Sequence, residues 1–558
     1  MTLATIPTLP DVVGFKYGTG AGPSQGSLGG STITVGGNTG DLAALLALAP
    51  GATNSPLNAD RTHRGNTYIL PAGATYLPGV GSTFTFPVTA GAGWTRFKTS
   101  GTLPAGTIGA AATRVSSANA AQMPLFRQTV PGTAVATIPL GSNGWIFEGI
   151  NGTCDLFDAT HPIFFLWQCS GNRVIFRQCY LHGHPNGPHQ RRALLITGSD
   201  SQVWDSWFSE WQDDSDCQAI WYLNRNDYTG SGGVAATDRH HVENNHLSAS
   251  TEITMVGDQT SSFNARHLTF RRNHYFKPLF WHQPNGTDPG DPGWDNISRA
   301  VKNHCEIKAG AFVLYEGNTY ENSWSAAQPG EAMVMNAGTN AQITDVTFQH
   351  NKVINGTQIA TVSSGFSDAA HIPQRVRIYN VLSLGANTNR EAFFNWDAPD
   401  TSMEHCTQVP STSTNPSYQG LCWQVSGPGK WARNTFQRNI FGKAMNGLVL
   451  LVNGSQVGNT DAVWNGQMPD REHHENVALW NYGTGLAGFK QFASMAAAGV
   501  NADGTLTATS PLKVGQPGYF GTDGKDIGVD FAALNAVMGG TGQTFSIATP
   551  TGISIVRV

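Results

Sequence analysis

The stretch HLTFRRNHYFKPLFW, residues 267–281, recurs in altered form along the chain and decides the fold. The related stretches are VIFRQCYLHG (174–183), VWDSWFSEW (203–211), HVENNHLSA (241–249), VLYEGNTYEN (313–322), VTFQHNKVIN (346–355), VRIYNVLSL (376–384) and NTFQRNIFGK (434–443). Every copy has a polar corner with an apolar or aromatic residue three positions before it and another two positions after it. This pattern is typical of short strands broken by a bend.

The spacing of the corners indicates a solenoid. The corners are Cys179, Ser206, Asn245, Asn273, Asn318, Asn351, Tyr379 and Asn439, and the intervals between them are 27, 39, 28, 45, 33, 28 and 60 residues. A common minimum with a variable excess is typical of coils that repeat one strand path and release the excess as loops. We expect the last interval to contain one further coil. Helical repeats are excluded because the copies lack an i, i+3, i+4 apolar pattern.

The sequence therefore predicts an all-β chain folded as a single-stranded, right-handed parallel β-helix. Asparagine suits a stacked bend because it tolerates the left-handed backbone region and its amide can bond to neighbouring coils. We expect a ladder of Asn245, Asn273, Asn318 and Asn351. In the column three positions before them, Phe270, Tyr315 and Phe348 should be buried. In the opening stretch Tyr275 should also point inwards, whereas Arg271, His274 and Lys277 should face solvent.

The composition agrees with this fold and excludes several partners. The 558 residues include 65 Gly and 29 Pro, and only 13% are charged, which favours turns and strands over helices. A net charge of -5 without a basic run argues against binding to nucleic acid or to an anionic membrane. The first residues lack the charged and apolar regions of a secretory signal, and seven scattered cysteines without a CxxC pair indicate buried thiols.

The ends of the chain differ from the repeats. Residues 1–38 are expected to form an arm or linker, and residues 39–80 a capping helix and the first coil. In the latter range, TGDLAALLALAPG (39–51) has Asp41 as a helix start and Pro-Gly as a stop. A helix there would cover exposed strand amides at the open end of the β-helix. Residues 81–447 form the predicted body, and residues 448–558 the C-terminal coils and cap.

Several motifs resemble one protein family. They are NTYILPAGATY (66–76), RRNHYFKPLFW (271–281), NHCEIKAGAFVLYEGNTYENSW (303–324) and GTDGKDIGVDF (521–531). Together they resemble the pectate-lyase-like right-handed β-helix proteins, mostly uncharacterised bacterial members, over roughly residues 65–534. The resemblance to phage tailspikes is looser. Cys305, Ala309 and Gly310 depart from the family pattern. The resemblance implies a fold more than a reaction, because this fold also carries proteins without catalysis.

Carboxylates and bases leave successive coils at comparable strand ends. We expect Asp216 and Glu252, with Arg272 and Lys277 close by, to line a groove on one flank of the body. In a hydrolase Asp216 and Glu252 would be the acid and its partner; in a lyase they would hold a cation, and Lys277 or Arg272 would supply the base. The alternative is that these are solvated turn carboxylates. The resembling family also has Gln and Glu at the positions of Gln218 and Glu252.

Further residues are candidates for contacts with a substrate. The expected set is Gln218, His274, Lys302, Glu306, Trp281 and Trp324. Tryptophan rings stack on the apolar faces of sugars, although the core also claims some of them. A salt-bridged ladder on a strand face is the alternative for Lys302 and Glu306.

The sequence predicts no metal-ligating residues. His182, His184 and His189 do not align on a helix or strand period, so loop histidines are the preferred interpretation. Asp523, Asp526 and Asp530 lack the spacing of an EF-hand. Calcium remains the candidate cofactor if the protein is a lyase.

The predicted function is binding or degradation of a polysaccharide or cell-surface glycan, as in tailspikes or pectate lyases. A polysaccharide lyase and a glycoside hydrolase both remain open. A virion or extracellular setting is expected, and the resemblance to tailspikes implies a homotrimer. The alternative is a non-catalytic structural or adhesive β-helix protein.

Overall fold

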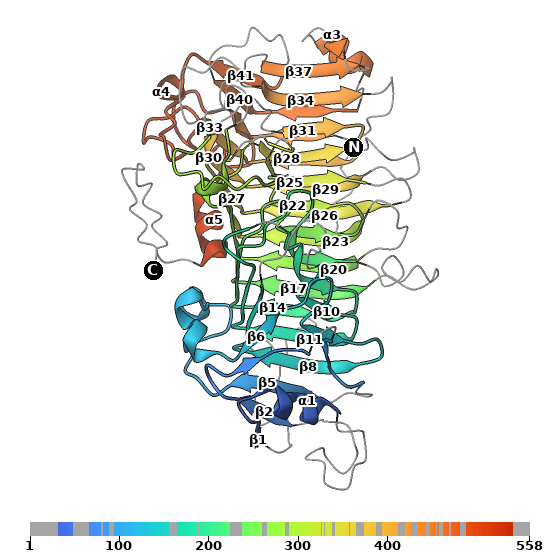
Figure 1. The fold of residues 1–558 in the computed structure, drawn as a ribbon. Helices are drawn as coiled ribbons and strands as arrows, with labels where there is room; N and C mark the ends of the chain where they lie inside the picture. The colour runs from blue at the N-terminus through green and yellow to red at the C-terminus, as the bar shows by residue number, and fades with distance from the viewer. Residues whose placement is uncertain are drawn as a thin grey trace.

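The protein is described here by a computed structural model in which three long sheets wind around one core (Figure 1). The structure describes residues 32–47, 66–79, 82–88, 94–155, 164–187, 189–223, 237–258, 265–284, 290–324, 326–328, 330–337, 341–356, 358–363, 373–386, 393–410, 419–425, 434–441, 447–452, 455–456, 461–467, 470–479 and 487–539.

We name the sheets A, B and C in the order in which the chain meets them. In spatial order, sheet A contains β1 (Thr32–Thr34), β2 (Thr67–Leu70), β5 (Thr95–Thr99), β8 (Asn143–Glu148), β11 (Asn172–Arg177), β14 (Gln202–Trp204), β17 (Asp238–Glu243), β20 (Ala265–Arg271), β23 (Gly310–Glu316), β26 (Ile343–Gln349), β29 (Gln374–Tyr379), β32 (Thr401–Glu404), β35 (Thr435–Gln437) and β39 (Glu472–His474).

Sheet B follows sheet A after a tight bend. It contains β3 (Thr75–Tyr76), β6 (Leu125–Gln128), β9 (Asn151–Cys154), β12 (Tyr180–His182), β15 (Trp207–Ser209), β18 (His246–Leu247), β21 (His274–Phe276), β24 (Thr319–Glu321), β27 (Lys352–Ile354), β30 (Leu382–Ala386), β33 (Thr407–Pro410), β36 (Ile440–Phe441), β40 (Asn476–Leu479) and β41 (Phe489–Phe492).

Sheet C closes each coil. It contains β4 (Phe84–Thr85), β7 (Ala136–Ile138), β10 (Trp167–Cys169), β13 (Arg192–Ile196), β16 (Gln218–Tyr222), β19 (Thr254–Val256), β22 (Cys305–Ile307), β25 (Glu331–Asn336), β28 (Gln358–Ser363), β31 (Phe393–Trp396), β34 (Gln419–Val425), β37 (Gly447–Val452) and β38 (Ser455–Gln456).

Each coil contributes one strand to each sheet, and the strands of neighbouring coils pair in parallel. The coil β17–β18–β19 is followed, for example, by β20–β21–β22, and all three strands pair with their successors. Among the described strands, β37 and β38 form an antiparallel pair at the C-terminal end of sheet C. The all-β fold is the right-handed parallel β-helix that the sequence predicts.

The asparagine ladder is confirmed. The side-chain oxygen of Asn273 accepts the main-chain N–H of Asn245 at 3.0 Å, and Asn318 does the same for Asn273 at 2.9 Å. Asn351 accepts the N–H of Asn318 at 2.8 Å. These four side chains are at most 1% exposed. Because each amide satisfies a buried main-chain group of the coil before it, the ladder fixes the bend between sheets A and B.

The aromatic column beside the ladder is also confirmed. Phe270, Tyr315 and Phe348 pair in register on sheet A and are fully buried. The rings of Phe270 and Tyr315 stack at 4.4 Å between centroids. Tyr275 points inwards as expected, with its ring 4.7 Å from that of Tyr320.

Two details of the sequence interpretation are wrong. Tyr379 is not the corner of its copy, because it pairs with Gln349, so that Val381 is level with Asn351. The register centred on Tyr379 puts Val376 and Val381 in the two apolar columns, whereas the observed register places the polar Ser383 level with Val353, which explains the slip of two residues. Lys277 does not face solvent but is fully buried. The further coil expected in the last interval is present as β32, β33 and β34.

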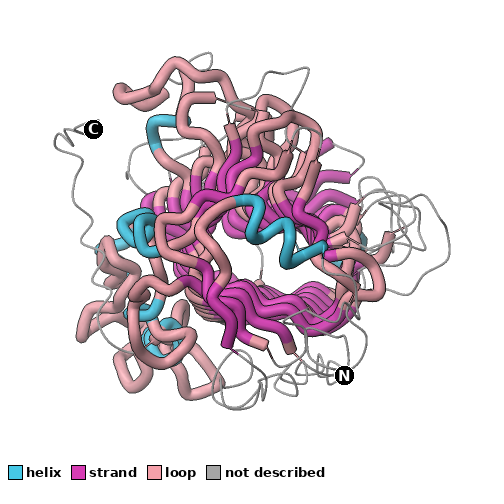
Figure 2. The backbone as a smooth tube through the Cα atoms, turned by 60° about the horizontal axis from the view of Figure 1, so that its bottom comes forward, coloured by secondary structure: helices cyan, strands magenta, loops and turns pink. Residues whose placement is uncertain are grey.

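Helices lie at both ends and along one side of the body (Figure 1). α1 (Thr39–Ala47) buries Leu42 and Leu45 in the main core and lies across the open end (Figure 2). β1 pairs in parallel with β2, so residues 32–34 of the segment expected to be an arm belong to sheet A. The remaining expected boundaries stay predictions.

The C-terminal part returns along the body. After α3 (Asp461–Gln467) and α4 (Met495–Ala498), the chain ends its described part in α5 (Phe531–Met538), beside β27 in Figure 1. Asn380 Oδ1 accepts the N–H of Asp530 at 2.7 Å. The other two aspartates of this region have protein partners as well: Asp523 pairs with His405, and Asp526 accepts the N–H of Val514. Among the described helices, none has the length and apolar character needed to span a membrane.

Candidate functional site

Polar side chains form a column at the start of the strands of sheet C. Arg192 begins β13 and pairs in register with Gln218, which begins β16. Ile220 pairs with Thr254, so Glu252, two residues before Thr254, is level with Gln218 on the next coil. Equivalent positions of successive coils are about 4.8 Å apart, so these side chains can bond to one another.

Gln218 links the members of this column. Its Oε1 accepts from Arg192 Nε at 2.7 Å. Its Nε2 donates to Asp216 Oδ1 at 2.7 Å and to Glu252 Oε2 at 2.9 Å. Arg192 also pairs with Asp216 directly. The expected pair of Asp216 and Glu252 is therefore brought together, with one amide nitrogen between the two carboxylates.

Two lysines and a second glutamate, from within and around β22, lie beside this column. Lys302 Nζ is 3.1 Å from Glu252 Oε1, and Lys308 Nζ is 3.6 Å from Glu306 Oε1. We call the set of seven residues the sheet C cluster: Arg192, Asp216, Gln218, Glu252, Lys302, Glu306 and Lys308. Glu252 and Glu306 are buried, whereas the side chain of Asp216 is 36% exposed.

The two buried glutamates have pKa values that are pushed apart. Burial, followed by the negative charge of Glu252, raises the pKa of Glu306 to about 8. Burial alone would raise the pKa of Glu252 too, but Lys302 and the neighbouring hydrogen bonds outweigh it and lower this pKa to about 2. At neutral pH the pair therefore carries one proton, on Glu306. Carboxyl pairs split in this way are typical of acid and base assignments in enzymes.

Lys277 lies beneath the cluster and is already bonded. Its Nζ donates to the carbonyl oxygens of Ala249, Ser250 and Thr251 at 2.9, 2.8 and 2.6 Å. Burial lowers the pKa of Lys277 to about 7. The three carbonyl acceptors oppose this change, because only the charged ammonium group has three N–H donors. Because the Lys277 ammonium is occupied by three carbonyl oxygens, the expected role as a catalytic base is not supported.

Arg272 and His274 lie elsewhere on the coil. Arg272 follows β20 at the bend between sheets A and B, and its guanidinium pairs with Glu243. His274 begins β21 on sheet B, where its Nε2 is 2.8 Å from Glu321 and its Nδ1 is 3.2 Å from His246. Their described polar contacts are with these neighbours, so the structure does not bring them to the sheet C cluster. The reason is that RRNH spans the bend between two sheets, which separates residues that are adjacent in sequence.

The two tryptophans expected to contact a substrate are buried. Trp281 is 1% and Trp324 4% exposed, and both pack with Val301 in a small apolar cluster. The ring of His282 stacks on Trp324 at 4.6 Å. These rings have no free face for a sugar. They instead support residues 300–302, whose main chain bonds to Asp213 and Ser250.

Arg192, Lys308 and Trp221 were not in the expected set of site residues, although they lie at the sheet C cluster. Trp221 is half-buried on β16, its register partner is Met255, and Met255 pairs with Glu306. The guanidinium of Arg192 lies 4.2 Å from the Trp221 ring centroid. An alignment of RALLI (192–196) with QAIWY (218–222) would have identified Arg192, because both segments begin with a polar residue before an apolar run.

No protein-family model and no curated protein matches the chain. Among solved structures, an alginate lyase from Paenibacillus sp. str. FPU-7 is 10% identical with a TM-score of 0.38, covering 67% of this chain and 98% of its own. Pectate lyase Pel9A is 13% identical with a TM-score of 0.38, covering 90% and 98%. A tailspike protein of E. coli bacteriophage HK620 is 10% identical with a TM-score of 0.38, covering 73% and 76%. At such values the chemistry of this chain must be inferred from its own side chains.

Proposed function

We propose that the chain binds an acidic polysaccharide at the sheet C cluster and hydrolyses it. The observation that carries the proposal is the pair Glu252 and Glu306, which shares one proton and is flanked by Lys302 and Lys308. When Glu306 is protonated, the cluster has three cationic side chains and two other carboxylates. The cations are Arg192, Lys302 and Lys308, and the carboxylates are Asp216 and Glu252. A site of this charge suits sugars that carry a carboxylate.

Glu306 is the proton donor in this proposal, and Asp216 is the second carboxylate. A raised pKa keeps a carboxyl protonated at neutral pH, as protonation of a glycosidic oxygen requires. Asp216 is the most exposed carboxylate of the cluster.

Hydrolysis is favoured over elimination because the bases expected for a lyase are occupied. Lys277 donates to three carbonyl oxygens, and Arg272 pairs with Glu243 on another part of the coil. Trp221 is proposed as the platform for a sugar ring. Trp221 is level with Met255, and Met255 is level with Glu306, so Trp221 and Glu306 are two strands apart on the outer face of sheet C. Strands are about 4.8 Å apart, which gives a separation of roughly 10 Å.

The test is incubation of the protein with a panel of acidic and neutral polysaccharides. Hydrolysis predicts new reducing ends without the absorbance of unsaturated uronates; that absorbance would show a lyase and overturn the hydrolytic assignment. Glu306→Gln should abolish cleavage. The matched control is Glu316→Gln, since Glu316 is a buried carboxylate paired with Arg271 on sheet A, away from the cluster. Equal loss in both variants would contradict the assignment.

A non-catalytic structural or adhesive protein is the second candidate. Burial of Glu252 and Glu306 favours it, because the same alternation of charges between coils occurs on sheet A, where Glu148 pairs with both Arg96 and Arg177. Binding of an acidic glycan without any new reducing ends would support this candidate and exclude the hydrolase.

We also propose an extracellular or virion setting and a homotrimer, on the basis of the sequence resemblance to tailspikes. Light scattering at micromolar concentration tests the trimer. A monomer under these conditions would contradict it.

A further inference from the structure

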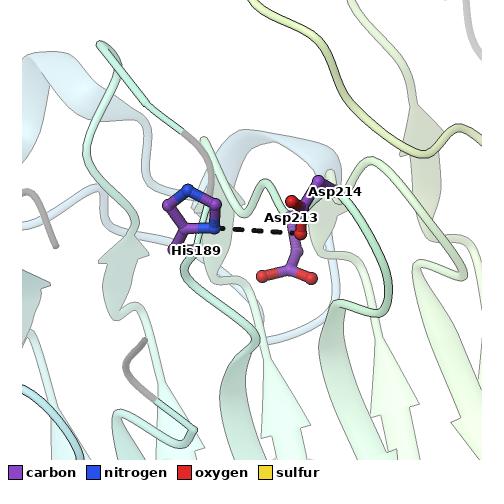
Figure 3. A group of neighbouring side chains, drawn as sticks. All are labelled: His189, Asp213 and Asp214. Atoms are coloured by element: carbon purple, nitrogen blue, oxygen red, sulfur yellow. Dashed lines mark ion pairs between the residues drawn. The ribbon is translucent and has the colours of Figure 1, made fainter. Parts of the chain in front are cut away.

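Three possible metal ligands meet beside the sheet C cluster. His189 lies in the loop between β12 and β13, and Asp213 and Asp214 lie in the loop between β15 and β16 of the next coil. Their ligand atoms are all within 4.8 Å of one another (Figure 3). Nδ1 of His189 is 3.8 Å from Oδ1 of Asp214. None of these three residues belongs to the sheet C cluster.

Main-chain bonding holds the two loops in this relation. The N–H of Gln190 donates to the carbonyl oxygen of Gln212 at 2.9 Å. The side chain of Gln212 reaches back to the carbonyl oxygen of His184 at 3.1 Å. Because Gln190 follows His189 and Gln212 precedes Asp213, these bonds bring the imidazole and the carboxylates together before any ion binds.

A buried carboxylate oxygen of this group accepts no hydrogen bond. Asp213 is 1% exposed, and its Oδ1 accepts from the N–H and hydroxyl of Ser215 and from the N–H of Asp216. Its Oδ2 is buried without a hydrogen bond. Nε of Arg191 is 3.7 Å away, beyond hydrogen-bonding distance, and also has no hydrogen-bond partner. The ion pair with Arg191 therefore leaves Oδ2 with a lone pair that a bound metal ion could use.

We propose that His189, Asp213 and Asp214 bind one divalent transition-metal ion of the Zn²⁺ or Mn²⁺ type. Imidazole nitrogen combined with carboxylate oxygen favours such ions, whereas Ca²⁺ prefers oxygen ligands alone. Three protein ligands leave a position for water. The ion ties the loops of two neighbouring coils together immediately before Asp216. This inference differs from the sequence interpretation, which grouped His189 with the other histidines of its loop, and it does not depend on the proposed function.

The test is equilibrium dialysis of the full-length, untagged chain, freed of metal with a chelator, against Zn²⁺, Mn²⁺ and Ca²⁺ in turn. We expect one Zn²⁺ or Mn²⁺ per chain, weaker binding of Ca²⁺, and a higher Tm with the bound ion. His189→Ala and Asp214→Asn should each weaken binding at least about tenfold. Both side chains are more exposed than that of Asp213, so these variants should fold, whereas Asp213→Asn disturbs a buried network.

The matched control is His184→Ala, which removes an imidazole from the same loop but not from the three ligands. Its metal affinity should equal that of the unchanged chain. Absence of stoichiometric binding would overturn the proposal and leave His189 and Asp214 as an ion pair only. Equal loss of affinity in His184→Ala and His189→Ala would overturn it as well, because it would place the ion elsewhere in the loop.

Discussion

Asn351 accepts the main-chain N–H of Asn318 with its side-chain oxygen at 2.8 Å, one coil further along the β-helix. The side-chain nitrogen of Asn318 donates in turn to the carbonyl oxygen of Phe270 at 2.9 Å, one coil back. One asparagine therefore links three coils. A ladder of this kind makes the bends interdependent, so that the loss of one member leaves buried main-chain groups unpaired.

Asn318→Ala should lower the free energy of unfolding by about 1 to 3 kcal/mol, because the buried N–H of Asn273 loses its acceptor. Urea unfolding followed by circular dichroism measures the change. Asn186→Ala, in an exposed loop, is the control and should change the free energy by less than about 0.5 kcal/mol. Equal values for both variants would contradict the structural role of the ladder.

Glu306→Gln should change how stability depends on pH. The folded-state pKa of Glu306 is raised from 4.5 to about 8, so its protonation stabilises the native state below 4.5, and this contribution is lost as the pH rises to about 8. The variant should therefore become more stable relative to the unchanged chain as the pH rises through this window. Urea unfolding at several pH values measures the difference, and a constant difference would contradict the raised pKa.

The same measurement in a Glu252→Gln background provides the control. The charge of Glu252 is the second cause of the raised pKa of Glu306, after burial. Without that charge, the effect of Glu306→Gln should depend less on pH. An unchanged dependence would show that the two carboxyl groups do not interact.

Lys277→Met should reduce stability rather than catalysis. The change leaves three buried carbonyl oxygens without their donor, and we expect a loss of more than about 2 kcal/mol in the free energy of unfolding. Turnover per folded molecule should be retained at low temperature. A variant that folds normally but does not cleave would restore Lys277 as a catalytic base.

Lys302→Met should weaken binding of an acidic polysaccharide roughly 10- to 100-fold, since a charge-assisted contact contributes about 1.5 to 3 kcal/mol. Arg272→Met should leave that affinity unchanged, because Arg272 lies at the bend between sheets A and B. Titration calorimetry with the polysaccharide identified by the panel compares the two. Weaker binding in Arg272→Met alone would move the binding face to that bend.

Trp221→Ala and Trp281→Ala should have different effects. Trp221 is half-buried on the outward face of β16, so its loss should weaken glycan binding and change stability little. Trp281 is 1% exposed, and its loss should cost about 3 to 5 kcal/mol of stability. Parallel binding and unfolding measurements distinguish the two roles. Reversed effects would show that the sugar platform is misplaced.

The repeat was readable in the sequence because a coil has a local rule. Each bend needs a residue that tolerates a tight turn, and each flanking strand needs apolar residues that point to the axis, so Asn245, Asn273 and Asn318 were found with their aromatic neighbours. The rule fails in the copy around Tyr379, because the polar Ser383 occupies a position that is apolar in the other copies. The helix that covers the N-terminal end was recognised from Asp41 and the Ala/Leu run because helix signals are local as well.

The site was only partly predictable. Asp216, Gln218, Glu252, Lys302 and Glu306 were expected and do lie together. Gln218 and Glu252 are level because strand register transfers a position from coil to coil, whereas Glu306 lies within β22, level with Met255. Arg272, His274, Trp281 and Trp324 were assigned by nearness in sequence, and nearness in sequence fails at a bend. Lys277 shows the same limit, since its side chain turns under the preceding coil.

The sequence by itself determined the coil, its inward and outward faces, and which strands begin with a polar residue. These features depend on the period of two within one strand and on the residue at the bend. Only the tertiary structure decided which charges meet. The contact of Asp213 with His189 and that of Glu252 with Glu306 join different coils across loops of unequal length. Burial also arises from neighbouring coils, and it is burial that raises the pKa of Glu306 and leaves Asp213 Oδ2 without a hydrogen bond.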